Sequence, residues 1–317
     1  MGGYSSEVDI SLTSGSVVYQ NLDSTKYNPY SIHILKDKWV YVDAAKKEFP
    51  IDKNDFSVLV NEQKITFDCV FNAIHGSPGE DGKILAYFDL IGMKHTSAPW
   101  YQMALTFNKR DTLSVVKHYE IPAATSIYLN KGDKIDTSKI IDTVGVPCFI
   151  KPNNAGSSFG ISKAYNANEI IAGIEKAYKE DSEILIESFL DGTEVSVGVI
   201  QYKGEIKVLP ITEITTENDF FDYEAKYEGK SEEITPARIS EADASKVRKL
   251  AKKVYQILNM SGFSRSEYIF VNGEPHFLEM NSVPGLTKES LLPQQANEAD
   301  INLSDLFDNA IETALNT

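Results

Sequence analysis

Apolar and polar residues are arranged in two kinds of pattern along this chain, which together predict a mixture of strands and helices. Short apolar runs of the kind that form buried strands occur at residues 68–74, 146–151, 183–187 and 194–202. Apolar residues spaced for one helix face occur at residues 9–22, 101–119, 167–179 and 245–260. Strands that alternate with helices predict an α/β layer with a parallel sheet.

Residues 265–271 and 275–281 predict a hairpin with Asn272 and Gly273 at its tip. Residues 214–236, by contrast, show no clear period and carry many polar groups. A loop of this length inside a compact protein is usually a lid or a disordered segment. The expected domain division is 1–92, 93–195 and 196–317.

Composition and charge exclude several classes of protein. The 317 residues carry a formal net charge of -15 and contain no Lys/Arg-rich block, which argues against a nucleic-acid partner. No apolar stretch approaches the ~20 residues of a membrane span, so we expect no membrane partner. Cys69 and Cys148 lie in apolar runs without metal-site spacing, which fits a reduced cytoplasmic setting.

The predicted hairpin carries candidate metal ligands. Arg265 and Glu267 are two residues apart and share one face, as do Glu279 and Asn281 on the next strand. Carboxylates and an amide oxygen suit Mg²⁺, although spacing alone leaves a solvated polar face open. A simple two-residue turn would place the two glutamates on opposite faces. We therefore expect a three-residue loop or a bulge near residues 273–274.

Other segments carry weaker signals of ligand binding. Lys151 closes an apolar run and is followed by the loop P-N-N-A-G-S-S-F-G, in which backbone N–H groups can approach a phosphate closely. Glu187 and Glu194 lie at a strand junction and suit an adenine amino group and a ribose hydroxyl, or are merely exposed strand-end acids. His75 begins the loop H-G-S-P-G-E-D-G, where a structural role is the more common one.

Taken together and in order, these segments resemble the D-alanine–D-alanine ligases of the ATP-grasp superfamily. The resemblance runs over nearly the whole chain, through G-G-Y-S-S-E-V-D-I-S-L-T-S-G, H-G-S-P-G-E-D-G, K-P-N-N-A-G-S-S-F-G, I-E-S-F-L-D-G-T-E, D-Y-E-A-K-Y, S-R-S-E and L-E-M-N-S-V-P-G-L-T-K-E-S-L-L-P. It implies an N-terminal Rossmann-like substrate domain, a central ATP-grasp subdomain and a C-terminal ATP-grasp subdomain with the metal site and the lid.

The resemblance also implies an activity and its ligands. Two D-alanines are joined through a D-alanyl phosphate at the expense of ATP, for peptidoglycan precursor synthesis in the cytoplasm. Two Mg²⁺ or Mn²⁺ ions assist the reaction, and the protein is expected to be a homodimer.

Residue roles follow from the same resemblance. The residues expected to bind ATP are Lys109, Lys151, Ser158, Glu187, Leu190 and Glu194. The expected metal ligands are Glu267, Glu279 and Asn281. The first D-alanine is expected to meet Glu7 and His75, and the second to meet Ser290 and Leu291. The groups expected to take part in catalysis are Glu7, Ser157, Lys226, Tyr227, Arg265 and the Gly285 backbone N–H.

The sequence departs from the family pattern at a few positions. The family opens with an apolar strand before the Gly-Gly turn, and we expect that strand to be absent here. Glu267 stands where an aspartate is usual, and Ala155 stands where a glutamate is common. The alternatives are a D-alanyl-D-lactate ligase, against which Tyr227 argues, and an inactive nucleotide-binding remnant.

Overall fold

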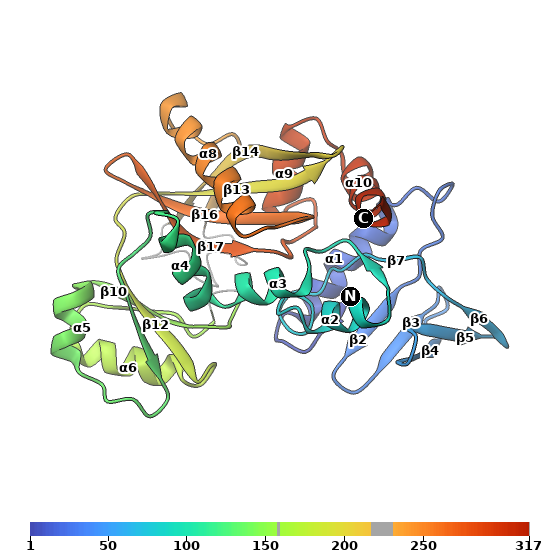
Figure 1. Ribbon diagram of the computed structural model, residues 1–317, viewed down its shortest axis with the longest axis horizontal. Coiled ribbons are helices and arrows are strands. Elements are labelled where there is room, and N and C mark those ends of the chain that lie inside the picture. Colours follow the sequence, from blue (N-terminus) through green and yellow to red (C-terminus); the bar gives the residue numbers. More distant parts are fainter. Residues whose placement is uncertain (157–158, 217–230, 317) are drawn as a thin grey trace.

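The computed structural model describes residues 1–156, 159–216 and 231–316. Its elements gather in regions that follow one another along the chain, blue to cyan up to about residue 100, green around residues 126–188, and yellow to red from residue 193 onward (Figure 1). Within these described ranges, no helix combines the length and apolarity needed to cross a bilayer.

The N-terminal region contains a sheet with the strand order β1-β2-β3-β4-β5-β6. Its strands are β1 (Gly2–Gly3), β2 (Ile32–Leu35), β3 (Trp39–Val42), β4 (Glu48–Asp52), β5 (Ser57–Val60) and β6 (Gln63–Ile65). β1 pairs with β2 in parallel, whereas β2 to β6 form an antiparallel meander. The expectation of a parallel sheet is thus wrong for the meander, because its strands return through short turns rather than through helices.

Helix α1 (Val8–Asn21) agrees with the helix predicted at residues 9–22. Gly2 and Gly3, expected as a turn after a missing strand, themselves form β1. Gly2 has a φ of +101°, and a Cβ at this position would lie 2.8 Å from the Ile34 carbonyl oxygen. Glycine is therefore needed for the close pairing of β1 with β2.

The next elements correct two predictions. Of the strand predicted at residues 68–74, only β7 (Cys69–Val70) is extended, and it pairs in parallel with β8 (Lys94–His95) beyond α2 (Lys83–Leu90). The single helix predicted at residues 101–119 is two helices, α3 (Trp100–Phe107) and α4 (Lys109–His118). They are separated at Asn108, whose backbone is extended and whose side chain accepts a 3.0 Å hydrogen bond from Asp111 N.

The central region is a sheet covered by two helices. The sheet has the order β11-β10-β12-β9, from β9 (Ser126–Asn130), β10 (Cys148–Pro152), β11 (Ser162–Ala164) and β12 (Glu183–Ser188). Helices α5 (Thr137–Val144) and α6 (Ala167–Ala177) form one core with its apolar face, which includes Ile150 and Ile186. Lys151 and Glu187 project from the other face, because successive side chains of a strand alternate.

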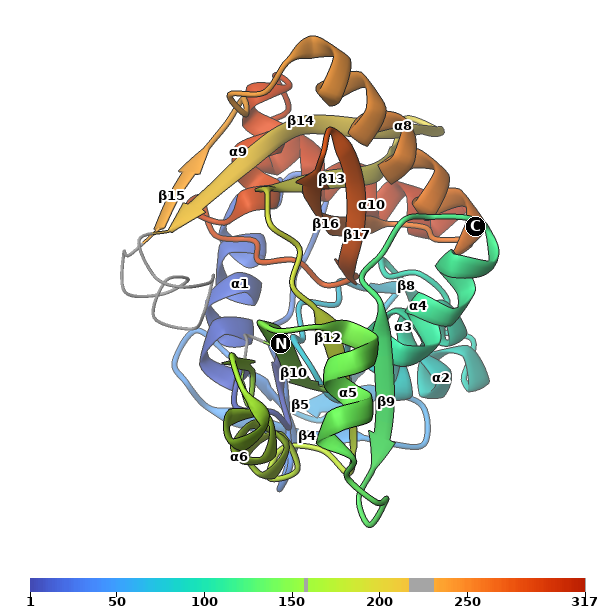
Figure 2. The same ribbon diagram turned by 90° about the vertical axis from the view of Figure 1, so that its left-hand side faces the viewer.

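The C-terminal region is a sheet with the order β15-β14-β13-β16-β17. Its strands are β13 (Thr193–Tyr202), β14 (Glu205–Thr216), β15 (Ser231–Ile234), β16 (Phe263–Val271) and β17 (Glu274–Asn281). Helix α8 (Glu241–Ile257) packs on the face that carries Val195 and Val197. Helix α9 (Leu291–Glu298) contacts the opposite face at Gly198, and α10 (Leu303–Asn316) follows it. Figure 2 shows β10 and β12 below β16 and β17.

The hairpin of β16 and β17 has its bulge in an unexpected place. Val271 pairs with Glu274, so the Asn272–Gly273 tip is a simple two-residue turn. The register shifts instead between Glu267 and Tyr268, where one extra residue of β17 enters the ladder. The need for a bulge is confirmed, but its predicted position at the tip is wrong, because Asn272 itself adopts the left-handed φ of 51° that a tight turn requires.

The predicted lid overlaps described strands at both ends. β14 continues to Thr216 and pairs with β15, so the segment of residues 214–236 begins and ends in a ladder. Residues 217–230 lie outside the described residues, and the lid stays a prediction. The division of domains near residues 92 and 195 also stays a prediction.

Candidate active site

The hairpin and its neighbour β13 present one polar face. Glu267 pairs directly with Glu279, and Arg265 with Asn281, so all four side chains lie on the same side of the sheet. That side is opposite to the one covered by α8. Arg265 forms a short ion pair with Glu267 and donates a 3.1 Å hydrogen bond to Ser196 Oγ. Burial alone would lower the pKa of Arg265, but the carboxylates around it, Glu267 first and then Glu279 and Glu233, together raise the pKa.

The proposed metal ligands fit a hard cation. Glu267 and Glu279 supply carboxylates, and Asn281 supplies an amide oxygen on the same face. Among the described residues, no three His, Cys, Asp or Glu side chains are grouped as metal ligands. A cation held here therefore takes only part of its coordination from carboxylates. Mg²⁺ commonly binds in this way, with water and substrate phosphates completing its shell.

Lys109 connects the central region to the hairpin face. It is the first residue of α4, and its Nζ donates a 2.9 Å hydrogen bond to the Ala155 carbonyl of the Gly/Ser loop. The same Nζ lies 3.4 Å from Glu279 Oε2. The phosphate-binding loop predicted from the sequence and the predicted metal ligands thus meet at one lysine.

Lys151 and Glu187 are paired on the polar face of the central sheet, with 2.8 Å between Nζ and Oε2. Burial would lower the pKa of Lys151, but Glu187 outweighs it and raises the pKa, with smaller contributions from Glu279 and Glu194. Lys151 is therefore charged at neutral pH. Leu190 lies half-buried between β12 and β13. These residues line the junction of the two sheets, where the sequence predicts the base and the ribose of ATP.

Glu7 directly precedes α1 and lies against two glycines. A Cβ added at Gly156 would lie 2.7 Å from Glu7 Oε2, and one added at Gly76 would lie 3.1 Å from the same atom. The Gly/Ser loop and the H-G-S-P-G-E-D-G loop both approach this carboxylate through bare backbone. A cavity of about 870 Å³ opens beside Glu7 and both glycines. The predicted site for the first amino acid therefore adjoins the predicted phosphate loop.

His75 is buried behind Glu7, held by the serines of α1. Its backbone N donates a 2.9 Å hydrogen bond to Ser11 Oγ, and its Nε2 lies 3.1 Å from Ser14 Oγ. Burial lowers the pKa of His75 to about 4, so the ring is neutral at pH 7. The sequence analysis missed both serines, although their spacing of three residues on one helix face is a usable signal.

Glu80 is a further buried acid that the sequence analysis missed. Its Oε2 accepts a 3.1 Å hydrogen bond from the Gly76 backbone N, and its own N donates to the Gly76 carbonyl. Burial, and then the nearby Glu7 carboxylate, raise the pKa of Glu80 to about 7. Its place inside a glycine-rich loop, where exposed polar residues are ordinary, gave no sign of burial.

The predicted site for the second substrate lies at the start of α9. Ser290 precedes the helix and Leu291 is its first residue. A Cβ at Gly285 would lie 2.6 Å from Ser290 Oγ, so these residues are close in space. Leu286 N donates a 3.4 Å hydrogen bond to Ser14 Oγ, which links this segment to His75. The predicted residues Ser157, Ser158, Lys226 and Tyr227 lie outside the described residues.

Comparison with known proteins places this chain in a family. Residues 1–98 match the family model described as D-ala D-ala ligase N-terminus, and residues 115–312 match the one described as D-ala D-ala ligase C-terminus. The chain belongs to the D-alanine–D-alanine ligase family. A family member from Flavobacterium johnsoniae, named D-alanine--D-alanine ligase, is 69% identical over 99% of this chain and 98% of its own length. Another family member, from Christiangramia forsetii, is 57% identical over 100% of this chain and 97% of its own length.

Solved structures of the family have the same fold. The VanG D-Ala:D-Ser ligase from Enterococcus faecalis superposes with a TM-score of 0.86 at 29% identity, covering 98% of this chain and 97% of its own. The D-alanine--D-alanine ligase from Bacillus anthracis complexed with ATP superposes with a TM-score of 0.79 at 26% identity, covering 100% and 96%. The ATP-grasp fold expected from the sequence is confirmed.

Proposed function

We propose that this protein uses ATP to join two molecules of D-alanine into D-alanyl-D-alanine, a precursor of peptidoglycan. The observation that carries the proposal is the position of Lys109. Its Nζ binds the Ala155 carbonyl of the predicted phosphate-binding loop and lies 3.4 Å from Glu279, a predicted metal ligand. Membership of the D-alanine–D-alanine ligase family supports the same activity.

The first step makes a carboxylate reactive. A carboxylate oxygen of the first D-alanine attacks the γ-phosphorus of ATP, ADP leaves, and D-alanyl phosphate forms. Moving a phosphoryl group between two anions is mainly a matter of alignment and charge neutralisation. Lys109 and Lys151 contact the phosphates in place of the Ala155 carbonyl and Glu187, while Glu7 binds the ammonium group of the substrate.

The second step forms the peptide bond. The amine of the second D-alanine attacks the acyl carbon, inorganic phosphate leaves, and the nitrogen gives up a proton. Arg265 and the Gly285 N–H stabilise the oxyanion of the tetrahedral intermediate. Ser290 and the first backbone N–H groups of α9 bind the second carboxylate, because helix N-termini favour anions. Lys226 and Tyr227 are proposed to cover the site from the lid.

Glu267, Glu279 and Asn281 are the residues proposed to hold the divalent metal. When bound, Mg²⁺ or Mn²⁺ neutralises phosphate charge, and we expect two ions. Glu187, the Leu190 backbone and Glu194 are proposed to hold the adenosine. A cytoplasmic location and a homodimer also stay predictions.

Phosphate release is the measurement that tests this function. With ATP and Mg²⁺, we expect release that requires D-alanine and is not supported by L-alanine. Offering D-lactate or D-serine against D-alanine identifies the second substrate by analysis of the product. Binding of ATP without any phosphate release would instead support the inactive remnant.

A further inference from the structure

Asn153, which directly follows β10, is fully buried and bound to the start of β12. Its exposed fraction is 0%. Its backbone N donates a 2.9 Å hydrogen bond to the Glu183 carbonyl, and its side-chain Nδ2 donates a 2.8 Å hydrogen bond to Glu183 Oε2. The beginning of the Gly/Ser loop is thus fixed to the central sheet by both main chain and side chain.

The other side of Asn153 is bound to the start of α4. Its carbonyl accepts a 3.4 Å hydrogen bond from Lys109 N, and its Oδ1 accepts a 2.9 Å hydrogen bond from Arg110 N. The first N–H groups of a helix have no partner within the helix. The Asn108 side chain accepts a hydrogen bond from Asp111 N. Asn153 accepts from the backbone N–H groups of Lys109 and Arg110, which precede Asp111.

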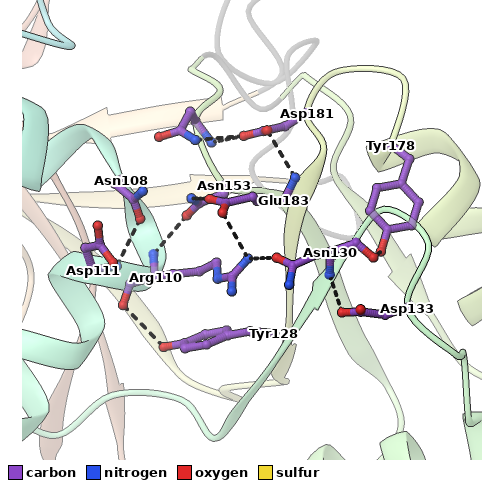
Figure 3. Close-up of polar contacts among 11 residues, drawn as sticks. Asn108, Arg110, Asp111, Tyr128, Asn130, Asp133, Asn153, Tyr178, Asp181 and Glu183 are labelled. Carbon is purple, nitrogen blue, oxygen red and sulfur yellow. Dashed lines mark hydrogen bonds and ion pairs between the residues drawn. The ribbon is translucent and has the colours of Figure 1, made fainter.

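The Arg110 side chain strengthens this connection (Figure 3). Its Nη1 donates a 2.9 Å hydrogen bond to Asn130 Oδ1 and lies 3.8 Å from Glu183 Oε1. Its guanidinium carbon lies 4.9 Å from the centre of the Tyr128 ring. The first turn of α4 is therefore held against β9 and β12 as well as against the Gly/Ser loop.

These contacts enclose the lysine that is proposed to bind phosphate. Lys109 is bound to Asn153 through its backbone N and to Ala155, two residues further on, through its Nζ. We propose that Asn153 is a positioning residue that fixes the start of α4 against the Gly/Ser loop and so sets where Lys109 Nζ meets the phosphates of ATP. This inference rests on the proposed function, which supplies ATP as the ligand.

Removal of the Asn153 amide acts on nucleotide binding in particular. It leaves Arg110 N and Glu183 Oε2 without this partner, and α4 can shift relative to the loop. Ser290, proposed to bind the second amino acid, directly precedes α9. Glu7, proposed to bind the first, directly precedes α1 and lies against the Gly/Ser loop at Gly156, three residues beyond Asn153. Because Asn153 binds the amides of Lys109 and Arg110 directly, a positioning role predicts a larger change for ATP than for D-alanine.

Asn153→Ala tests the proposal, with Asn154→Ala as its matched control. Asn154 is the next residue of the same loop, but it is exposed and binds Asp181 rather than α4. We expect Asn153→Ala to raise KM and Kd for ATP about tenfold, with KM for D-alanine within about twofold of wild type. Asn154→Ala should leave both constants near the wild-type values. Equal KM for ATP in the two variants would overturn the proposal.

A second pair of variants keeps the test valid if Asn153→Ala does not fold. Asn153→Asp retains the acceptor for Arg110 N but places a carboxylate against Glu183, and it should weaken ATP binding. Adding Glu183→Gln restores a hydrogen bond with donor and acceptor exchanged, and it should recover much of the affinity. Absence of recovery, or equal losses for ATP and D-alanine, would contradict a positioning role.

Direct titration with ATP separates this inference from the proposed function. If wild type binds ATP but releases no phosphate with D-alanine, the proposed function fails. The comparison of Kd values between Asn153→Ala and Asn154→Ala still decides the role of Asn153 in that case.

Discussion

Single side chains in the site are held in defined charge states by their neighbours. Lys151 is kept charged by Glu187, and Glu80 has its pKa raised to about 7 by burial and by Glu7. His75 is kept neutral, because burial lowers its pKa to about 4. Each state has a consequence that can be measured as a dependence on pH.

His75 predicts a loss of stability in acid. Its pKa falls from 6.5 in the unfolded chain to about 4 in the folded one, so the unfolded state binds more protons between these values. The contribution of neutral His75 to the free energy of unfolding is therefore fully present above pH 6.5. It is lost as pH falls toward 4, and the total loss is roughly 3 kcal/mol. Unfolding free energies of wild type and His75→Asn at pH 7 and pH 5 check this. A difference between the two proteins that is independent of pH would contradict it.

Glu279→Gln should abolish most of the turnover while the fold survives. The substitution removes one anionic ligand from the face shared with Glu267 and one partner of Lys109. We expect a loss of about 100-fold or more, because groups that stabilise developing charge are worth that much. Glu274→Gln, at the exposed tip of the same strand, is the control and should retain activity. Normal turnover in Glu279→Gln would remove the basis for the metal assignment.

The sequence predicts which residues form the hairpin face of the site more readily than it predicts the contacts that hold the site together. Arg265, Glu267, Glu279 and Asn281 were placed on one face from their spacing and the resemblance, and the register agrees. Asn153 was overlooked, because its importance comes from burial and from contacts with residues 30 or more positions away. Neither quantity can be obtained from a local pattern.

Among the elements, the interruption between α3 and α4 matters most for the site. A continuous helix would place Lys109 in its interior, whereas the extended backbone at Asn108 makes Lys109 the first residue of a new helix. The positive end of the α4 dipole is thereby added to the lysine charge at the phosphate loop. No proline or glycine marks this break, so the helical spacing of residues 101–119 extended across it.

Asn108→Ala should cost about 1 kcal/mol of stability, as loss of a helix cap usually does. Asn166→Ala removes the equivalent cap from α6, far from Lys109 in sequence, and should cost a similar amount. We expect a rise in KM for ATP only in the first variant, because only that cap adjoins Lys109. Thermal unfolding combined with kinetics checks this pair, and a rise in both variants would refute the link.

The meander shows where prediction of elements failed. Residues 23–67 yielded no predicted elements, although E-F-P-I-D in β4 alternates between exposed and buried side chains. Its charged ends and central proline weakened the apolar signal. In contrast, β10, β12, β13 and α8 were found within a few residues of their bounds, since each has a long apolar face in a core.

For the whole molecule, polar faces of the central and C-terminal sheets lie close together where we propose that ATP binds. Lys109 begins α4 and Lys151 lies on β10 of the central sheet, while Glu279 and Arg265 lie on the C-terminal sheet. A nucleotide bound as proposed would contact both regions and should stabilise them together. The order of motifs along the chain predicts this arrangement, whereas the contact between Lys109 and Glu279 is visible only in the structure.

A non-hydrolysable ATP analogue with Mg²⁺ should therefore raise the melting temperature by several degrees. At 100 times Kd the added stability is about 2.7 kcal/mol. The analogue with a chelator should give a smaller shift, because uncompensated phosphate charge then lies beside Glu267 and Glu279. Melting curves under the two conditions provide the comparison, and equal shifts would argue against a metal at this face.

The bulge between Glu267 and Tyr268 divides the hairpin into a tip side and a base side. On the tip side, Phe277 is 1% exposed and packs in the core beneath α8. On the base side, Glu279 turns toward the site. The pairings of Glu267 with Glu279 and of Arg265 with Asn281 lie on the base side, away from the Asn272–Gly273 turn. An epitope tag or a fluorescent reporter inserted in that turn should leave ligation intact, which makes it a natural attachment point for labelling the active enzyme.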